Sequence, residues 1–211
     1  MTEGWLNENV KRNHGALGAY TPQEYVSEGD TPSFLPHIDN GLFQHVNYTW
    51  GGWGGRPAFT SGTSGHMTDA GETADDDDEN KPFWRWIPAL QNDFAARMDW
   101  AVTSGYADAN HNPRAAVAGG VRRSVAASEV VTLDASPTVD PDGDALAFRW
   151  WQYYDADSAD TRVTILDDTQ MTGASFTVPD EPGRDVHVIL EVTDDGSPPL
   201  THYQRIVFEL H

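Results

Sequence analysis

The sequence has 211 residues, of which 33 are acidic and 13 basic, so its formal net charge at pH 7 is −20. A surface of this sign repels phosphate backbones and argues against a nucleic-acid partner, while the absence of cysteine excludes disulfides and thiolate metal sites. No stretch approaches the roughly 20 apolar residues of a membrane span, and no apolar segment of signal-peptide length follows Met1, so we expect neither feature in this chain.

The first half of the chain contains one clear amphipathic pattern. Every fourth residue is apolar in one segment, at Leu90, Phe94, Met98 and Val102. This spacing predicts a helix that begins after Pro88 and ends near Gly105. Shorter helices are expected at residues 21–26 and from residues 30–32. The Gly-rich and acidic residues 51–79 are expected to form a functional loop or to pack against something outside this chain, with residues 75–78 as a solvated loop.

The second half has the pattern of an all-β domain. Short β-branched and aromatic runs, each bounded by turn residues, occupy residues 128–136, 145–154, 161–167, 174–179, 186–194 and 201–210. With a strand before residue 128, they predict about seven strands in roughly 100 residues, as in an immunoglobulin-like sandwich. Alternation predicts one apolar face, formed by Val186, Val188, Leu190 and Val192. Trp150 or Trp151 is expected at the centre of the core.

Several segments, taken together, have a familiar order. Along nearly the whole chain lie EGDTPSFL, GGWGGR, NDFAARMDW, ANHNPRA, DPDGDALAFRWWQY and EVTDDGSPPLTHYQRIV. They resemble the bacterial cellulose-binding protein family, in which a nucleoside-hydrolase-like domain precedes a C-terminal immunoglobulin-like domain. The members of that family are longer, and their first strand carries an Asp cluster that has no counterpart here.

The resemblance therefore implies the C-terminal half of such a protein. Residues 1–110 would be the remnant of the nucleoside-hydrolase-like domain, and residues 111–211 the immunoglobulin-like β-sandwich. The expected fold is mainly β, with a partial α/β segment and one long amphipathic helix before the sandwich. The resemblance further implies an extracellular or periplasmic location, a polysaccharide or small sugar ligand, and a missing N-terminal hydrolase-like domain as partner.

A candidate ligand site lies in the Gly-rich segment that contains Trp50, Trp53 and Arg56. Aromatic faces can bind the apolar side of a pyranose ring, and an Arg can donate hydrogen bonds to its hydroxyl groups. The alternative is that these tryptophans fill the interface between the first segment and the sandwich. The sequence does not decide between the two.

Two metal sites are considered, both for calcium. The resemblance matches Asp30 to a late calcium ligand of nucleoside hydrolases, although Asp30 is also suited to cap a helix. Asp140, Asp142 and Asp144 alternate around a Gly turn as in many calcium loops, with a tight turn between strands as the alternative. No zinc-helix, nucleophile-elbow, dinucleotide or phosphate-loop motif occurs in the sequence, so no catalytic residue is assigned.

Two functional hypotheses follow. The first is a non-catalytic module that binds a cellulose-type β-glucan. The second is the C-terminal half of a calcium-dependent glycoside or nucleoside hydrolase-like enzyme whose metal-binding N-terminal half is absent. A purely structural role for the sandwich is a third alternative, because fold alone does not determine function.

Overall fold

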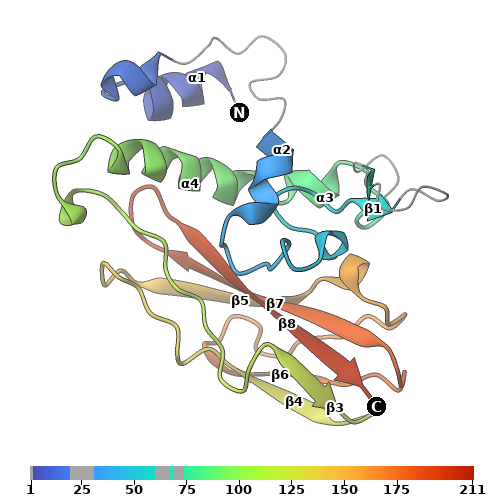
Figure 1. The fold of residues 1–211 in the computed structure, drawn as a ribbon. Helices are drawn as coiled ribbons and strands as arrows, with labels where there is room; N and C mark the ends of the chain where they lie inside the picture. Colours follow the sequence, from blue (N-terminus) through green and yellow to red (C-terminus); the bar gives the residue numbers. More distant parts are fainter. Residues whose placement is uncertain (1, 20–30, 60–66, 69–73) are drawn as a thin grey trace.

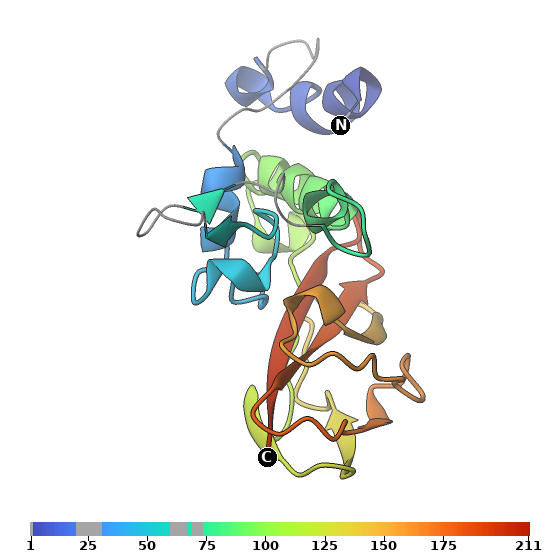
Figure 2. The same ribbon diagram turned by 90° about the vertical axis from the view of Figure 1, so that its right-hand side faces the viewer.

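The computed structural model of the chain describes residues 2–19, 31–59, 67–68 and 74–211. A β-sandwich forms one part of the molecule, and a layer of short helices and loops from the earlier residues lies against one side of it (Figures 1 and 2). The helix expected at residues 21–26 and the candidate ligand Asp30 lie outside the described residues. No helix in the described part of the chain is long and apolar enough to cross a membrane.

The sandwich consists of two sheets of different size. The larger has the strand order β3-β8-β7-β5, and the smaller pairs β4 with β6. β3 runs parallel to β8, whereas the other pairs in these sheets are antiparallel. The bounds are Arg122–Val125 for β3, Val130–Asp134 for β4, Leu146–Gln152 for β5, Thr172–Thr177 for β6, Asp185–Asp194 for β7 and Thr201–Leu210 for β8. The predicted mainly-β, immunoglobulin-like fold is confirmed.

The core between the two sheets has the composition predicted from strand alternation. Val186, Val188, Leu190 and Val192 of β7 all belong to it. Trp150 is the largest side chain in this core and only 1% exposed, and its indole Nε1 donates a hydrogen bond of 2.8 Å to the carbonyl of Gln170. Burial of each such apolar side chain contributes about 1.5–3 kcal/mol. Apolar packing thus holds together a sandwich that has no disulfide.

One predicted strand is wrong. Residues 161–167 form no strand, and Leu166 alone makes a bridge, to Ser175. The backbone N–H of Val163 donates instead to a side chain, with a hydrogen bond of 2.7 Å to Gln152 Oε1. Val163 still packs against the core without a paired strand.

The layer before the sandwich contains short elements and one longer helix. They are α1 (Glu3–Leu6), a π-helical turn (Asn7–Lys11), α2 (Thr31–Phe34), β1 (Ala58–Phe59), β2 (Met67–Thr68), α3 (Lys81–Trp84) and α4 (Ile87–Trp100). Single 3-10 turns occupy Gly15–Gly18, Leu35–His37, Tyr48–Trp50 and Tyr106–Asp108, and another, Tyr154–Ala156, follows β5.

Helix α4 is shorter than predicted. It ends at Trp100, so Val102 lies beyond it and is 45% exposed. The other three residues of the predicted stripe are buried to different extents in two separate clusters. Leu90 packs near the sandwich, whereas Phe94 and Met98 pack with residues of the N-terminal turns. The helix therefore bridges α1 and the sandwich.

A second apolar cluster joins the helical layer to the outer face of the larger sheet. Its buried members from the first segment are Leu35, Leu42, Trp53 and Trp86, and those from the sandwich are Tyr153, Ile189 and Tyr203. The side of β7 opposite the sandwich core is thus also buried. The domain boundary between residues 110 and 111 stays a prediction, and the two segments share this core.

A loop extends the larger sheet beside β8. β3 pairs only with Val207 to Leu210 of β8. Further along the same strand, the N–H of Tyr203 donates to the carbonyl of Asn40 at 2.9 Å, and the N–H of Arg205 donates to that of Gly41 at 3.0 Å. Gly41 has φ +82°, and a Cβ there would lie 1.7 Å from the carbonyl oxygen of Tyr203, so only glycine fits this close approach.

Candidate functional site

A cleft of about 460 Å³ opens where the helical layer meets the sandwich. One wall comes from α3 and the start of α4, and the other comes from β5, β7 and β8. Four aromatic side chains line it, those of Trp86, Trp151, Tyr154 and Tyr203. Concave sites that combine aromatic walls with a few polar groups are the usual binding sites for small ligands.

Packing fixes the aromatic wall. Trp86 and Tyr203 are 2% and 3% exposed, and their rings meet edge to face with centroids 5.3 Å apart. The ring centroid of Trp151 lies 5.8 Å from that of Trp86, and its Nε1 donates a hydrogen bond of 3.2 Å to Glu191. Trp151 is only partly buried, so it offers aromatic surface to a ligand in an orientation that its neighbours hold.

The charged residues of the cleft contrast with the rest of the chain. Among the described residues, four of the chain's 13 basic side chains line it, namely Lys81, Arg85, Arg149 and Arg162. The acidic residues that line it are Asp76, Asp155 and Glu191. The site is therefore close to neutral on a protein of net charge −20. It offers both donors and acceptors to a polar ligand.

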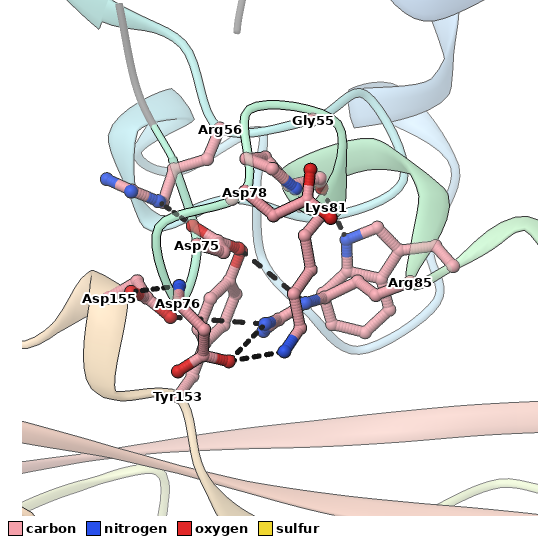
Figure 3. A network of polar contacts seen from close by, with 12 residues as sticks. Gly55, Arg56, Asp75, Asp76, Asp78, Lys81, Arg85, Tyr153 and Asp155 are labelled. Atoms are coloured by element: carbon pink, nitrogen blue, oxygen red, sulfur yellow. Dashed lines mark hydrogen bonds and ion pairs between the residues drawn. The ribbon is translucent and has the colours of Figure 1, made fainter.

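Behind the cleft, a buried carboxylate organises these charges (Figure 3). Asp75 is fully buried and accepts hydrogen bonds from Arg56 Nε at 2.7 Å and from the Tyr153 hydroxyl at 2.8 Å. Arg85 Nε lies 3.6 Å from the same carboxylate. The guanidinium of Arg85 stacks over Tyr153, 4.7 Å from the ring centroid. Asp75 thus holds Arg85 at the inner end of the cleft.

The prediction that residues 75–78 form a solvated loop is wrong for Asp75. Asp76 and Asp77 have φ of +50° and +63°, and the backbones of Asp75 and Asp78 form hydrogen bonds in both directions at 3.1 Å. This tight turn leaves its central residues exposed and directs Asp75 inward. Burial of the carboxylate is tolerated because two guanidinium groups and a hydroxyl group surround it.

The next residue, Asp76, connects the turn to both walls of the cleft. Its carboxylate pairs with Lys81 and, at 2.9 Å, with Arg162, while its backbone N–H donates to Asp155 at 3.0 Å. The hydrogen bond from Lys81, with a smaller contribution from Arg162, holds the pKa of Asp76 below its ordinary value despite partial desolvation. Asp76 is therefore charged at neutral pH, and α3 is tied to the sandwich.

The predicted ligand residues Trp50, Trp53 and Arg56 do not form one exposed surface, and none of them lines the cleft. Trp53 is 1% exposed within the shared core, which matches the alternative that it fills the interface. Arg56 is paired with Asp75. Trp50 is partly exposed, with its ring edge-on to His187 at a centroid distance of 5.1 Å.

A buried arginine fastens this Gly-rich segment to the sheet. Arg205 is fully buried and donates to the carbonyls of Leu42 at 2.8 Å, Trp50 at 3.1 Å and Gly51 at 2.8 Å. It also donates to His187 Nδ1 at 2.9 Å, which requires the neutral imidazole with its proton on Nε2. Burial lowers the pKa of Arg205 to about 10, so the guanidinium is charged at neutral pH. The segment is therefore a fixed support behind the cleft.

The candidate calcium ligands in the second half do come together. One carboxylate oxygen from each of Asp140, Asp142 and Asp144 lies within 4.8 Å of the others. The same residues form the tight turn that was the alternative, because Asp140 Oδ1 accepts the N–H groups of Asp142 at 2.9 Å and Gly143 at 2.8 Å. The turn and a cation site are compatible in one structure.

Sequence reasoning missed the cleft because its residues are far apart in the chain. A usable signal existed for one of them. Adjacent residues of a strand point to opposite faces, so a core position for Trp150 places Trp151 on the outer face of the sheet. Arg85, Arg149 and Arg162 have no common sequence pattern, and only the fold brings them together.

Two family models match the chain. Residues 1–56 match "Cellulose-binding Sde182, nucleoside hydrolase-like domain". Residues 130–210 match "Cellulose-binding protein Sde0182, C-terminal domain". A search of curated protein sequences finds no match.

Among solved structures, the chain is similar to a nucleoside hydrolase-related hypothetical protein from Saccharophagus degradans that is associated with carbohydrate metabolism. The two are 35% identical with a TM-score of 0.86, and the match covers 100% of this chain and 54% of that one. The chain thus spans about half the length of this relative. Two weaker matches are each 15% identical to this chain. The match to the PKD domain of the KIAA 1837 protein covers 52% of this chain and 93% of that domain, with a TM-score of 0.34. The match to mouse protocadherin PcdhgC3 EC1-3 covers 47% of this chain and 33% of that protein, with a TM-score of 0.26.

Proposed function

Since the chain resembles the C-terminal half of the bacterial cellulose-binding protein family, we propose that it is a non-catalytic module that binds a cellulose-type β-glucan in the cleft between α3, α4 and the sandwich. An insoluble polysaccharide of this kind is met outside the cytoplasm, so the proposal includes an extracellular or periplasmic location.

The cleft is the observation that carries the proposal. A glucose ring presents apolar C–H faces and a rim of hydroxyl groups, so a site for it needs aromatic surface beside hydrogen-bond donors and acceptors. Trp151 supplies such surface, and Arg149 and Glu191 provide a donor and an acceptor beside it. Because the positive and negative side chains that line the cleft nearly cancel, an uncharged ligand suits it better than a strongly charged one.

Binding to insoluble cellulose, measured by pull-down and depletion of the supernatant, tests the proposal. Trp151→Ala and Arg149→Ala should weaken binding, and we expect about 1–3 kcal/mol for the tryptophan, or roughly a 5- to 150-fold loss of affinity. Trp84→Ala is the matched control, because Trp84 lies at the end of α3 but is 66% exposed and does not line the cleft. Raising the salt concentration should change the affinity for this neutral polymer little.

The other outcomes discriminate between the alternatives. Binding that is lost in Trp50→Ala but retained in Trp151→Ala would move the site to the Gly-rich segment. Equal loss in Trp84→Ala would contradict the cleft. Absence of binding by the parent chain would favour a purely structural role for the sandwich.

The second candidate function is a hydrolase-like one. It is favoured by the match of residues 1–56 to a nucleoside hydrolase-like domain. In that case this chain would be the C-terminal half of a calcium-dependent glycoside or nucleoside hydrolase. Release of ribose from nucleosides, or of reducing sugar from cello-oligosaccharides, measured with calcium present, separates the two. Our proposal expects no turnover, and turnover that follows the protein through purification would support the hydrolase.

A further inference from the structure

The corner of the sandwich between the turn before β5 and the end of β7 gathers carboxylates in a defined arrangement. Asp140 Oδ1 accepts three backbone N–H groups, from Asp142 at 2.9 Å, Gly143 at 2.8 Å and Asp144 at 3.0 Å. The turn thereby folds the side chains of Asp140, Asp142 and Asp144 together, with one oxygen of each within 4.8 Å of the others. Calcium–oxygen distances of about 2.3–2.6 Å place two ligands of one ion up to about 5 Å apart. The spacing therefore fits a shared cation.

A separate observation at the end of β7 also indicates a missing positive partner. Asp194 is 4% exposed, and its Oδ1 accepts hydrogen bonds from Asn110 at 3.0 Å, Gly196 at 3.0 Å and Leu200 at 2.9 Å. Its other oxygen, Oδ2, is buried without a hydrogen-bond partner among the described residues. A buried carboxylate oxygen left without a donor is costly and calls for a ligand.

Strand register places Asp194 near the turn. Asp194 pairs with Leu146, the first residue of β5, and Asp144 precedes Leu146 by two residues, so the turn lies next to the end of β7. Asp140 Oδ2 is likewise buried without a partner in the part of the chain that the structure describes. Two buried carboxylate oxygens of this corner, one from Asp140 and one from Asp194, thus lack a hydrogen-bond partner among the described residues.

The electrostatics of this corner agree with the geometry. Burial, and after it the negative charges of Asp140 and Asp194, raise the pKa of Asp144. Burial also raises the pKa of Asp194. Carboxylates that disfavour each other's charge in this way are stabilised when a cation binds between them.

We propose that Asp140, Asp142, Asp144 and Asp194 form a binding site for a divalent cation of the calcium type. Carboxylate oxygens are the ligands of hard cations such as Ca²⁺, and Ca²⁺ completes its six to eight ligands with backbone carbonyls or water. The site is separate from the cleft and does not depend on the proposed β-glucan binding.

The site lies at the joint between the helical layer and the sandwich, which gives the cation a structural consequence. Asn110, which binds Asp194, also accepts through its backbone carbonyl a hydrogen bond of 2.6 Å from Trp100 at the end of α4. The next residue, His111, has its ring parallel to those of Trp100 and Tyr106 and donates its backbone N–H to Asp142 at 2.7 Å. A bound cation would therefore stiffen the segment that connects α4 to the sandwich.

Calcium titration of the full chain by isothermal titration calorimetry tests the site, with Tm measured in EDTA and in 10 mM Ca²⁺. We expect one calcium per chain, with a Kd of about 10⁻⁴–10⁻³ M, and a rise in Tm of about 3–6 °C or more. Mg²⁺ at the same concentration controls for screening of the acidic surface and should have a smaller effect.

Asp144→Asn and Asp142→Asn should each weaken calcium binding at least tenfold, whereas Asp180→Asn, which removes an exposed charge elsewhere in the sandwich, should leave it unchanged. Asparagine retains the size of the side chain, and the two variants give independent readings if one of them fails to fold. Absence of calcium binding by the parent chain, an equal response to Mg²⁺, or parent-like binding by both variants would overturn the proposal.

Discussion

Tyr153 donates its hydroxyl proton to Asp75 across 2.8 Å, and this hydrogen bond joins the sandwich to a turn 78 residues earlier in the chain. Removal of the Asp75 charge should be strongly destabilising, because Arg56 would lose its ion-pair partner and Arg85 would keep only the more distant carboxylates of Asp76 and Asp155. We expect Asp75→Asn to lower the free energy of unfolding by about 3–5 kcal/mol. Asp77→Asn in the same turn, where Asp77 is exposed, is the matched control and should change it by less than about 0.5 kcal/mol. Urea unfolding measures both, and similar losses in the two variants would contradict the role given to Asp75.

Arg205 should not be replaceable by lysine. The nitrogens of its guanidinium group donate hydrogen bonds to three carbonyl groups and to His187, and the single ammonium group of a lysine cannot bind all four. We expect Arg205→Lys to lower the free energy of unfolding by about 2–4 kcal/mol, since buried acceptors lose their donors. Arg184→Lys, at an exposed position, should have little effect on the same denaturant curve. If Arg205→Lys had the same denaturant midpoint of unfolding as the parent, the buried guanidinium group would not be required for stability.

The buried imidazole of His187 should make the protein sensitive to acid. Burial, with a further contribution from Arg205, lowers the pKa of His187 to about 3, whereas the unfolded chain has a His pKa of about 6.5. Between pH 6.5 and pH 3, His187 is protonated in the unfolded state but not in the folded state. The free energy of unfolding is therefore highest above pH 6.5 and falls as the pH is lowered. From pH 7.5 to pH 5, His187 should account for about 2 kcal/mol of this loss.

Unfolding of His187→Gln at the two pH values isolates the contribution, because other titrating groups are shared with the parent. His211→Gln removes an exposed histidine and should keep the parent's pH dependence. An unchanged pH dependence in His187→Gln would contradict the assignment.

Gly41 and Gly183 allow backbone strain to be separated from steric clash. Both have φ of +82°, but a Cβ at Gly41 would meet the backbone of Tyr203, whereas a Cβ at Gly183 meets nothing within 4 Å. Gly183→Ala should therefore lower the free energy of unfolding by only about 1–2 kcal/mol, the cost of placing alanine in the left-handed conformation. Gly41→Ala should cost more, by at least about 2 kcal/mol, because the loop must move away from β8. Equal Tm values for the two variants would show that the loop is not held against the strand.

The sandwich could be predicted from the sequence because its information is local. Alternation with a period of two residues identified the inner face of β7, whereas in the strand before it the sequence left Trp150 and Trp151 as alternatives for the core aromatic residue. The shared core could not be predicted, because β7 carries His187 and Glu191 beside Ile189 on its outer face, a mixture typical of a solvated surface. Asp75 lies in a run of four acids, and only the fold brings Arg56, Arg85 and Tyr153 around it.

The pairing of residues 40–41 with β8 has a consequence for self-association. An uncovered strand edge presents free N–H and C=O groups to which a second chain can add a strand, and proteins generally cover or interrupt such edges. β3 covers only the last residues of β8, and Asn40 and Gly41 occupy the hydrogen-bonding positions beside Tyr203 and Arg205. The loop therefore protects this edge against aggregation in addition to anchoring the helical layer.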